Sequence, residues 1–220
     1  MTGKATDWDA YYKRPAAPAQ LTRRISAARI VKTLRPALSQ PGVTICELGG
    51  ANSCFIDDFL ALPSLAAYHI IDNKRYGLEL VRNRLHSQSR VSTELADVMA
   101  MQPREKAFDV VYSVGLIEHF DRDGTARCIE THFDLCRPGG TVLITFPPPT
   151  LPYRAIRSAA ESLRIWAFPD ERPLGFDEVV KSCARHGEVL HQSINWWIGL
   201  TQGYVLTRKS ATRAGATEQD

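Results

Sequence analysis

Five short apolar runs alternate with helical segments across the middle of this 220-residue chain. The runs have the length and β-branched composition of strands, and the segments between them place apolar residues at helical spacing. Strands that alternate with helices form a parallel sheet with right-handed crossovers. We therefore expect a doubly wound α/β fold. The five expected parallel strands are Val43–Leu48, Tyr68–Ile71, Val91–Leu95, Phe108–Ser113 and Thr141–Phe146.

The pattern changes after residue 146. Two further strands, Glu188–Asn195 and Gly203–Arg208, are joined by a short segment and should pair antiparallel. The expected helices are Gln20–Leu38 (with Leu21, Ile25, Ala28, Val31 and either Leu34 or Arg35 on its inner side), Cys54–Leu62 (capped by Ser53), Lys74–His86, Asp123–Cys136 (stopped by Arg137–Gly140), Tyr153–Ala167 (with Ile156, Ala160, Leu163 and Ala167 on one face) and Phe176–His186.

The length suits one domain with a core of its own. We expect a single domain over 1–208 and a disordered tail over 209–220, which is polar and rich in small residues. The domain would consist of an N-terminal lid and helix (1–40), a core (43–146), an insertion that is a candidate lid (147–174), and a C-terminal helix with strands (175–208).

Composition excludes several classes of protein. The five cysteines form no Cys-x-x-Cys pair, which suits a reducing compartment. The first residues lack the apolar core of a signal peptide, and no apolar stretch approaches the length of a membrane span. A net charge of +3 gives no footprint for nucleic acid. We expect a cytoplasmic protein without stable membrane insertion or a nucleic-acid partner; its oligomeric state stays open.

Acidic and glycine residues follow the predicted strands, where open parallel sheets bind their ligands. Glu47 precedes a glycine-rich turn, whose backbone amides can approach a ligand closely. A carboxylate there disfavours a pyrophosphate and favours a cationic ligand. Asp72 after the second strand can accept hydrogen bonds from both hydroxyls of a ribose, and Asp97 after the third could meet an adenine amino group. Asp72 could instead be a turn-forming residue before Asn73, and Asp97 could be a plain loop acid.

Together these segments resemble class I S-adenosylmethionine-dependent methyltransferases of the small-molecule type. The resemblance covers roughly residues 43–146, and its ordered set of motifs is more specific than any one of them. It rests on Glu-x-Gly-Gly from Glu47, the acids Asp72 and Asp97, Phe108–Ser113 with the following Glu118-His119-Phe120, and Arg137–Thr141. It implies a Rossmann-like sheet of seven strands, mostly parallel, whose last strand is antiparallel.

The resemblance also implies a cofactor, S-adenosyl-L-methionine, and roles for individual residues. Glu47 would lie near the amino group of its methionine part, Asp72 would hold the ribose, and Ser113 would form the floor of the site. The full implied cofactor set is Glu47, Gly49, Gly50, Ala51, Asn52, Asp72, Asn73, Asp97, Val98, Ser113 and Val114.

The chain departs from the family pattern at two places. Ala51 and Ser53 stand where relatives often carry glycine, and the methyl group of Ala51 could shift the loop. Some relatives bind a divalent metal through Glu-x-x-Glu-His, but Gly115 replaces the first glutamate here, so Glu118 and His119 lack a third ligand nearby. We expect no metal.

His119 is the candidate catalytic residue, because it follows the fourth strand and a histidine of near-neutral pKa suits removal of a proton from an acceptor. It could equally pack beneath the loop, and alignment of the reactants alone could supply most of the rate.

The acceptor pocket should come from segments outside the shared core, namely the aromatic start of the chain, the insertion and the last loop. The candidate substrate-binding residues are Tyr11, Tyr12, Tyr153, Arg154 and Trp196, with Trp8 and Trp197 as neighbours. Acceptors that fit aromatic and arginine side chains include a sugar, a polysaccharide precursor, a phenol or a lipid head. Whether an O or an N atom is methylated stays open.

Two other functions are compatible with parts of the sequence. A methyltransferase-like scaffold could bind cofactor without turnover, although the three acids at strand ends favour an active enzyme. A nicotinamide-dependent oxidoreductase would carry Gly-x-Gly-x-x-Gly, which this turn lacks.

Overall fold

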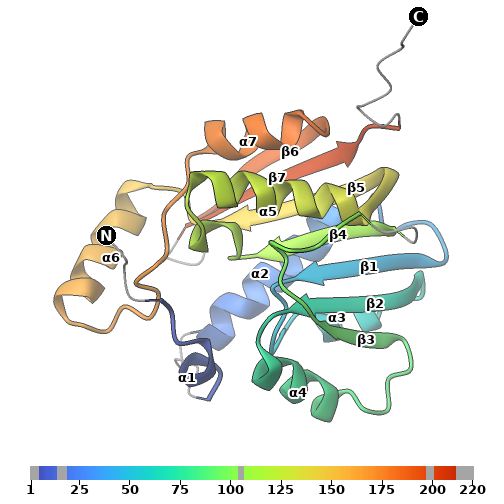
Figure 1. Cartoon of the computed structure of the whole chain (residues 1–220), viewed down its shortest axis with the longest axis horizontal. Coiled ribbons are helices and arrows are strands. Elements are labelled where there is room, and N and C mark those ends of the chain that lie inside the picture. The colour runs from blue at the N-terminus through green and yellow to red at the C-terminus, as the bar shows by residue number, and fades with distance from the viewer. Residues whose placement is uncertain (1–4, 14–18, 104–106, 197–200, 212–220) are drawn as a thin grey trace, which may run out of the picture.

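Seven strands of the described residues form one sheet in the order β3-β2-β1-β4-β5-β7-β6 (Figure 1). The computed structural model describes residues 5–13, 19–103, 107–196 and 201–211, with side chains described from residue 24 onward in the second segment. The strands are β1 Val43–Leu48, β2 Leu65–Asp72, β3 Val91–Leu95, β4 Phe108–Val114, β5 Cys136–Phe146, β6 Gly187–Asn195 and β7 Gln202–Lys209. Strands β1 to β5 are parallel, whereas β7 pairs antiparallel with both β5 and β6. The predicted doubly wound fold is confirmed.

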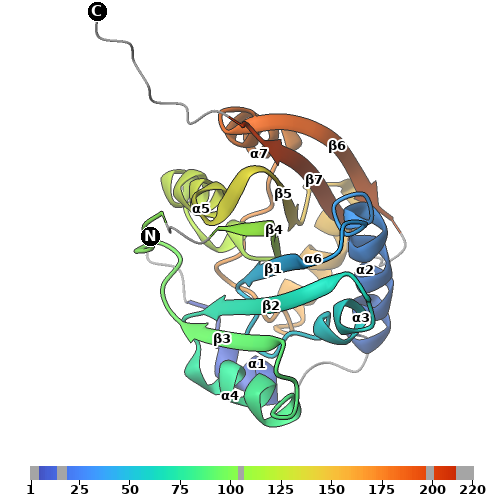
Figure 2. The ribbon, with the colours of Figure 1, turned by 90° about the vertical axis from the view of Figure 1, so that its right-hand side faces the viewer.

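Helices cover both faces of this sheet, as Figure 2 shows with α5 on one side and α2 and α3 on the other. Because the strand order reverses between β1 and β4, the crevice for a ligand lies beyond the carboxyl ends of these two strands. The helices are α1 Trp8–Lys13, α2 Ala19–Leu34, α3 Ile56–Leu60, α4 Arg75–Arg84, the short 3₁₀ helix η1 Ile117–His119, α5 Arg122–Leu135, α6 Leu151–Ser162 and α7 Phe176–Ala184.

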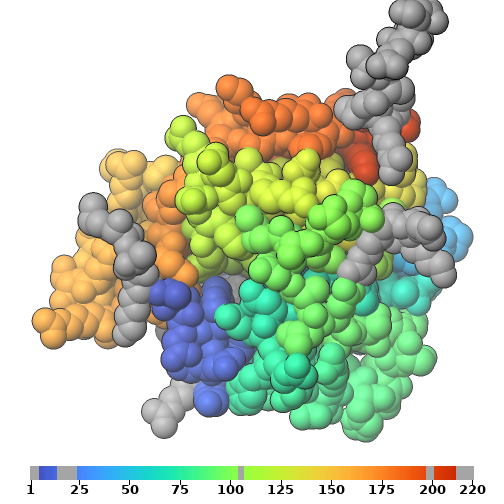
Figure 3. All heavy atoms as spheres, in the orientation of Figure 1, coloured from blue at the N-terminus to red at the C-terminus, as the bar shows by residue number. Residues whose placement is uncertain are grey.

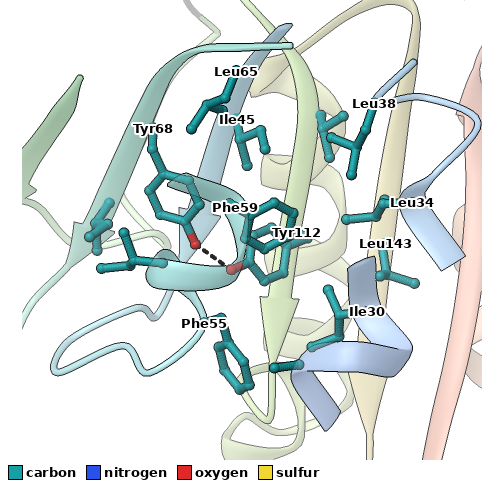
Figure 4. Packing of buried hydrophobic residues seen from close by; sticks show 14 of the residues in the cluster. Ile30, Leu34, Leu38, Ile45, Phe55, Phe59, Leu65, Tyr68, Tyr112 and Leu143 are labelled. Carbon is teal, nitrogen blue, oxygen red and sulfur yellow. Dashed lines mark hydrogen bonds between the residues drawn. The ribbon is translucent and has the colours of Figure 1, made fainter. Parts of the chain in front are cut away.

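Two apolar cores lie on the two faces of the sheet. One packs α2 and α3 against the strands through Ile30, Leu34 and Phe59 (Figure 4). The other packs α5 and α7 against the opposite face through residues such as Ile129 and Val179. The central strands bury side chains on both faces, as expected for parallel strands covered by helices.

The inner side of α2 differs from the prediction. Ala28 is exposed, and Ile25 and Val31 are only half-buried, whereas Ala27, Ile30 and Leu34 are buried. These three positions follow the i, i+3, i+7 spacing of one helix face, shifted from the face that we predicted. The side chain of Leu21 lies outside the described residues. The helix ends at Leu34, and turns carry the chain on to residue 38.

Several other element boundaries were wrong: β2 begins at Leu65 instead of Tyr68, and α6 spans Leu151–Ser162 instead of Tyr153–Ala167. The starts of α3 and β5 also differ. Helix α3 begins at Ile56, and its flanking residue Phe55 provides no side-chain cap; the Ser53 hydroxyl accepts from the Phe55 amide and donates to Glu47 ahead of the helix. Strand β5 begins at Cys136, directly after α5, where we expected a turn at Arg137–Gly140. Cys136 adopts an extended backbone and pairs with Phe108 of β4, so the helix break and the strand start coincide.

The insertion helix α6 turns its apolar face outward. Ile156 and Leu163, predicted to share one face with Ala160, are exposed, and Leu163 is 69% exposed. Its inner side instead carries the buried Tyr153, which contacts Trp166. The helix therefore packs through its polar-aromatic side, and it projects from one side of the molecule in Figure 1.

The two C-terminal strands pair antiparallel, as predicted. Lys209, which we placed in the tail, belongs to β7, and its ammonium group donates to the carbonyl oxygens of Phe133 and Cys136. The join at 197–200 and the tail from 212 lie outside the described residues. Among the described helices, none is long and apolar enough to cross a membrane.

Candidate active site

A cavity of about 460 Å³ opens at the carboxyl ends of β1, β2 and β4. This volume lies within the range of roughly 300–1,000 Å³ that small-molecule sites occupy. Helix α1 and the segment 168–171 form its outer wall, and Figure 3 shows α1 lying between α4 and the α6 region. The cavity therefore combines strand ends of the core with the aromatic start of the chain and the insertion, two of the segments from which we expected the acceptor pocket.

The turn after β1 requires glycine at Gly49. Its φ is +69°, a conformation that favours glycine, and its amide donates to the carbonyl oxygen of Ile71 at 2.9 Å. A side chain there would also bring its Cβ within 2.9 Å of Leu116. The glycine thus holds the turn close to β2 and leaves room for the loop that follows β4.

The alanine that replaces a family glycine is accommodated by the helix beneath it. Ala51 is buried, and a Cβ at Gly77 of α4 would lie only 2.6 Å from the Ala51 methyl group. Gly77 therefore provides the space that Ala51 fills. Asn52 has a φ of +53°, which asparagine tolerates better than most residues, so the turn keeps a tight path without the second glycine.

Glu47 is buried in a network of hydroxyl groups that the sequence did not reveal. Its carboxylate accepts hydrogen bonds from Tyr68 at 2.6 Å and from Ser53 at 3.0 Å, and the Tyr68 hydroxyl also contacts that of Tyr112 (Figure 4). Burial raises the pKa of Glu47 to about 7, although these hydrogen bonds oppose the shift. A cation bound in the cavity would favour the ionised form.

Asp72 is anchored by the backbone of two neighbouring segments. Its Oδ2 accepts from the Ala51 amide at 2.9 Å, and its Oδ1 accepts from the Lys74 amide at 2.7 Å. Burial raises its pKa, and these hydrogen bonds partly offset the effect. The carboxylate lines the cavity beside Asn73 and Tyr12, and it also fixes the glycine turn to the end of β2.

Two predicted cofactor residues do not line the cavity. Asp97 is exposed, and its side chain accepts from the Met99 amide. Ser113 is buried, and its hydroxyl lies 2.8 Å from Nε2 of His132 on α5, on the other side of the strand. Because successive side chains of a strand alternate between faces, Val114 faces the cavity in place of Ser113. Val98 lines it as expected.

His119 lies at the cavity wall within a set of specific contacts. Its Nδ1 is 3.0 Å from Oδ1 of Asp170, and its ring meets Trp8 edge to face at 5.0 Å. Asp170 also accepts from the amide and the hydroxyl of Thr6. Burial lowers the pKa of His119 while Asp170 opposes this shift, so the ring is neutral near pH 7 and its Nε2 can accept a proton.

Two further acids lie beside this histidine. Glu118 is only 3% exposed, and its Oε2 has no hydrogen-bond partner among the described residues. Burial, with repulsion from Glu171 and Asp170, raises the pKa of Glu118 well above its usual range. Glu171 accepts from the Tyr153 hydroxyl, and its pKa is raised by burial against that hydrogen bond.

The predicted acceptor residues separate into two groups. Tyr11 and Tyr12 line the cavity from α1, and Trp8 does so too. Tyr153 lies outside the lining and contacts it through Glu171, whereas Arg154 and Trp196 are exposed and do not line it. Trp197 lies outside the described residues. No set of three or more metal-ligating side chains is gathered anywhere in the described parts of the chain.

The sequence profile of a methyltransferase domain family matches residues 45–140. This segment holds most of β1, all of β2 to β4, and α5, and its glycine turn and strand ends line one side of the cavity. Residues 45–140 are a methyltransferase domain. The predicted methyltransferase family is thereby confirmed for this segment, and residues 6–12 and 168–171, which complete the cavity, lie outside it.

Solved structures show the same fold. The N-methyltransferase NodS from Bradyrhizobium japonicum WM9, in complex with S-adenosyl-L-homocysteine, is 16% identical, with a TM-score of 0.63 over 83% of this chain and 86% of NodS. Magnesium protoporphyrin IX methyltransferase (ChlM) from Synechocystis PCC 6803, also with bound S-adenosylhomocysteine, is 10% identical, with a TM-score of 0.74 over 92% and 93%. A possible exported protein from Bordetella parapertussis is 15% identical, with a TM-score of 0.70 over 95% and 80%.

No curated protein sequence matches this chain. At the identities above, the solved structures show the fold of the methyltransferase and do not identify its acceptor. The cytoplasmic location expected from composition stays a prediction.

Several cavity residues were missed at the level of sequence. Asp170 and Glu171 belong to a segment that reads as an ordinary polar loop, and Thr6 lies in a short polar start. Phe168 closes the wall against Trp8, with ring centroids 5.7 Å apart. The available signal was the pair of neighbouring acids, Asp170 and Glu171, in an insertion whose only other acidic residue is Glu161.

Proposed function

We propose that this methyltransferase transfers the methyl group of S-adenosylmethionine to an oxygen or nitrogen atom of a small-molecule acceptor. The observation that carries the proposal is one cavity that joins two acidic strand ends, at Glu47 and Asp72, to a histidine–aspartate pair, at His119 and Asp170. The first pair suits the cofactor, and the second suits an acceptor that must lose a proton.

The donor set at β1 and β2 fits S-adenosylmethionine. Glu47 provides a buried carboxylate for a positively charged amino group, and Asp72 provides an acceptor for ribose hydroxyls. The turn at Gly49, Gly50 and Ala51 would lie along the methionine part, with Val98 against the adenine. When bound, this cofactor supplies a methyl group on a sulfonium, so that the acceptor lone pair forms a bond to the methyl carbon while the carbon–sulfur electron pair passes to sulfur.

His119 would act as the general base. With Nδ1 engaged by Asp170, Nε2 is the nitrogen free to take the acceptor proton. Trp8 and Phe168 flank the imidazole and exclude water from one side of it. Among the described residues, Asp170 makes its side-chain hydrogen bonds to the histidine and Thr6, so its part is to position the ring.

The size of the cavity supports a small acceptor, and NodS and ChlM, which share the fold, are named for methylation reactions. Calorimetry on the purified protein tests the cofactor: S-adenosylmethionine and S-adenosylhomocysteine should bind without added metal, and NAD should not compete. Binding of NAD with no signal from either cofactor form would contradict the proposal.

Turnover is tested separately, by intact-mass screening of amine, phenol and sugar acceptors with protein and cofactor. A mass gain of one methyl group on any acceptor supports an enzyme. Cofactor binding without transfer to any class of acceptor would support a scaffold without turnover.

A further inference from the structure

We propose that the acceptor is an amine that enters as an ammonium ion and binds against Glu118 and Glu171, under the aromatic rings of α1 and Phe168. This inference rests on the proposed function and specifies its substrate class. It starts from the part of the cavity that is lined by Glu118, Glu171 and the aromatic rings, which the proposed cofactor residues do not occupy.

Glu118 is the central observation. A carboxyl group removed from water is costly unless a cation or several donors compensate it, and the Oε2 of this residue has no partner among the described residues. It lines the cavity. An ammonium group in the cavity would supply the missing charge and up to three donors.

The cations near Glu118 are already engaged elsewhere. Arg172 makes a two-fold contact with Glu178, at 2.8 and 3.0 Å, and also donates to the Thr125 hydroxyl. Arg157 donates to Glu161 and to the backbone carbonyl of Glu171. Asp170 is held by Thr6 and His119. Arg157 thus offsets part of the charge of Glu171 but makes no described contact with Glu118.

Aromatic rings complete a site for a cation. Trp8, Tyr11 and Phe168 surround the cavity beside His119, and Tyr11 and Phe168 lie 5.2 Å apart between ring centroids. The face of an aromatic ring attracts a cation, most strongly where water is excluded. A carboxylate on one side and aromatic faces on another form an environment in which an ammonium ion is favoured over a neutral hydroxyl group, and an anion is repelled.

The same groups allow the bound ammonium to become a nucleophile. An ammonium nitrogen has no lone pair, so one proton must leave before the nitrogen can attack. Nε2 of His119 can take that proton, which leaves the electron pair on nitrogen for the new bond to the methyl carbon. After transfer the methylated ammonium and the His119 imidazolium each carry one positive charge, which Glu118 and Asp170 offset until the product and the histidine each release a proton to solvent.

The test measures binding, so it does not depend on turnover. Protein saturated with S-adenosylhomocysteine is titrated by calorimetry with two matched pairs, 2-phenylethylamine with 2-phenylethanol and tryptamine with tryptophol, and with 3-phenylpropanoate. We expect each amine to bind roughly ten- to hundredfold more tightly than its alcohol, because the alcohol donates a neutral hydrogen bond to the carboxylate where the ammonium ion donates a charged one. The carboxylate should not bind.

The variant Glu118→Gln should remove most of the preference for the amine while leaving the affinities for the alcohols and for S-adenosylhomocysteine unchanged. Glu79→Gln, an exposed acid on α4, is the matched control and should change nothing. If Glu118→Gln does not fold, the comparison of amine with alcohol on the wild type still decides the question.

Equal affinity for amine and alcohol, or no binding of either amine at millimolar concentration, would overturn the proposal. Failure of S-adenosylhomocysteine to bind would contradict the proposed function instead, and the amine titration on the protein alone would still report on this site.

Discussion

Nδ1 of His119 lies 3.0 Å from Oδ1 of Asp170, although 51 residues separate them in the chain. The contact joins the loop after β4 to the segment that follows α6, and Thr6 joins the N-terminal segment to the same carboxylate. One aspartate therefore connects the three parts of the chain that form the acceptor side of the cavity. Its role should be visible in kinetics as well as in stability.

Asp170→Asn should lower kcat at least about tenfold, because the histidine loses the partner that fixes its ring orientation. Asp170 raises the pKa of His119 against the effect of burial, so the acidic limb of the rate profile should move to lower pH in the variant. A pH series of kcat/KM checks both effects. A variant with unchanged limb and reduced thermal stability would show that Asp170 only anchors Thr6.

His119→Ala should reduce the rate by roughly 10²–10⁴-fold if the histidine is the base. Burial lowers its pKa, so kcat/KM of the wild type should rise with pH and reach its plateau below the range of an ordinary histidine. Affinity for S-adenosylhomocysteine, measured by calorimetry, is the control and should change little. Near-normal turnover of a stable variant across this pH range would mean that alignment alone drives transfer.

The alternation of strands and helices was predictable, because each strand and each turn has its own local sequence pattern. The run Val43–Leu48 and the following glycines are local signals, and Glu47, Gly49 and Gly50 do line the cavity. The acceptor half depends on contacts between distant segments, such as Asp170 with His119, which no local pattern encodes. The prediction for helix α6 failed for a related reason. The spacing of its apolar residues indicated a buried face, but Tyr153 is the residue that is buried, whereas Leu163 is exposed.

The roles of Asp97 and Ser113 show a finer limit. Asp97 was placed by its position after a strand, but its side chain accepts from the Met99 amide in the loop. Ser113 was placed by its position at the end of a strand, where a shift of one residue reverses which face a side chain takes. Ser113 faces α5, so Val114 lines the cavity. Sequence position located the strand end, whereas the direction of each side chain needed the structure.

Asp72→Asn should weaken S-adenosylmethionine binding by roughly ten- to hundredfold, because ribose hydroxyls lose a charged acceptor worth about 1.5–3 kcal/mol. Asparagine is preferred to alanine here, since Asp72 also accepts from the Ala51 and Lys74 amides, and its complete removal would loosen the turn. Calorimetry gives the affinity, and the melting temperature without ligand is the control. A large drop in melting temperature with unchanged affinity would assign Asp72 to the turn alone.

Glu47→Gln should flatten the pH dependence of stability. The folded-state pKa of Glu47 is raised by burial from 4.5 to about 7, so between these values the folded protein holds a proton that the unfolded chain has released. The free energy of unfolding therefore falls as pH rises through this window, by roughly 2–3 kcal/mol. Burial also raises the pKa values of Asp72 and Glu118, so the variant should lose only the share of the slope due to Glu47. Denaturant titrations at pH 5 and pH 8 without cofactor measure how much the free energy of unfolding changes between these two values. An equal change in the wild type and in the variant would contradict the raised pKa of Glu47.

Substitution of two arginines of α6 can distinguish a role of this helix in acceptor binding from a plain solvent-exposed surface. Arg157 donates to Glu161 and to the carbonyl oxygen of Glu171, whereas Arg154, one turn away on the same helix, is exposed. Arg157→Ala should release the backbone of Glu171 and raise the acceptor KM severalfold, while the affinity for S-adenosylhomocysteine stays the same. Arg154→Ala removes an equal charge from the same helix and should leave both quantities unchanged. Steady-state kinetics with a responsive acceptor and calorimetry with S-adenosylhomocysteine distinguish the two variants. An equal rise in KM for both would mean that the net charge of α6 matters, and that the contact to Glu171 does not.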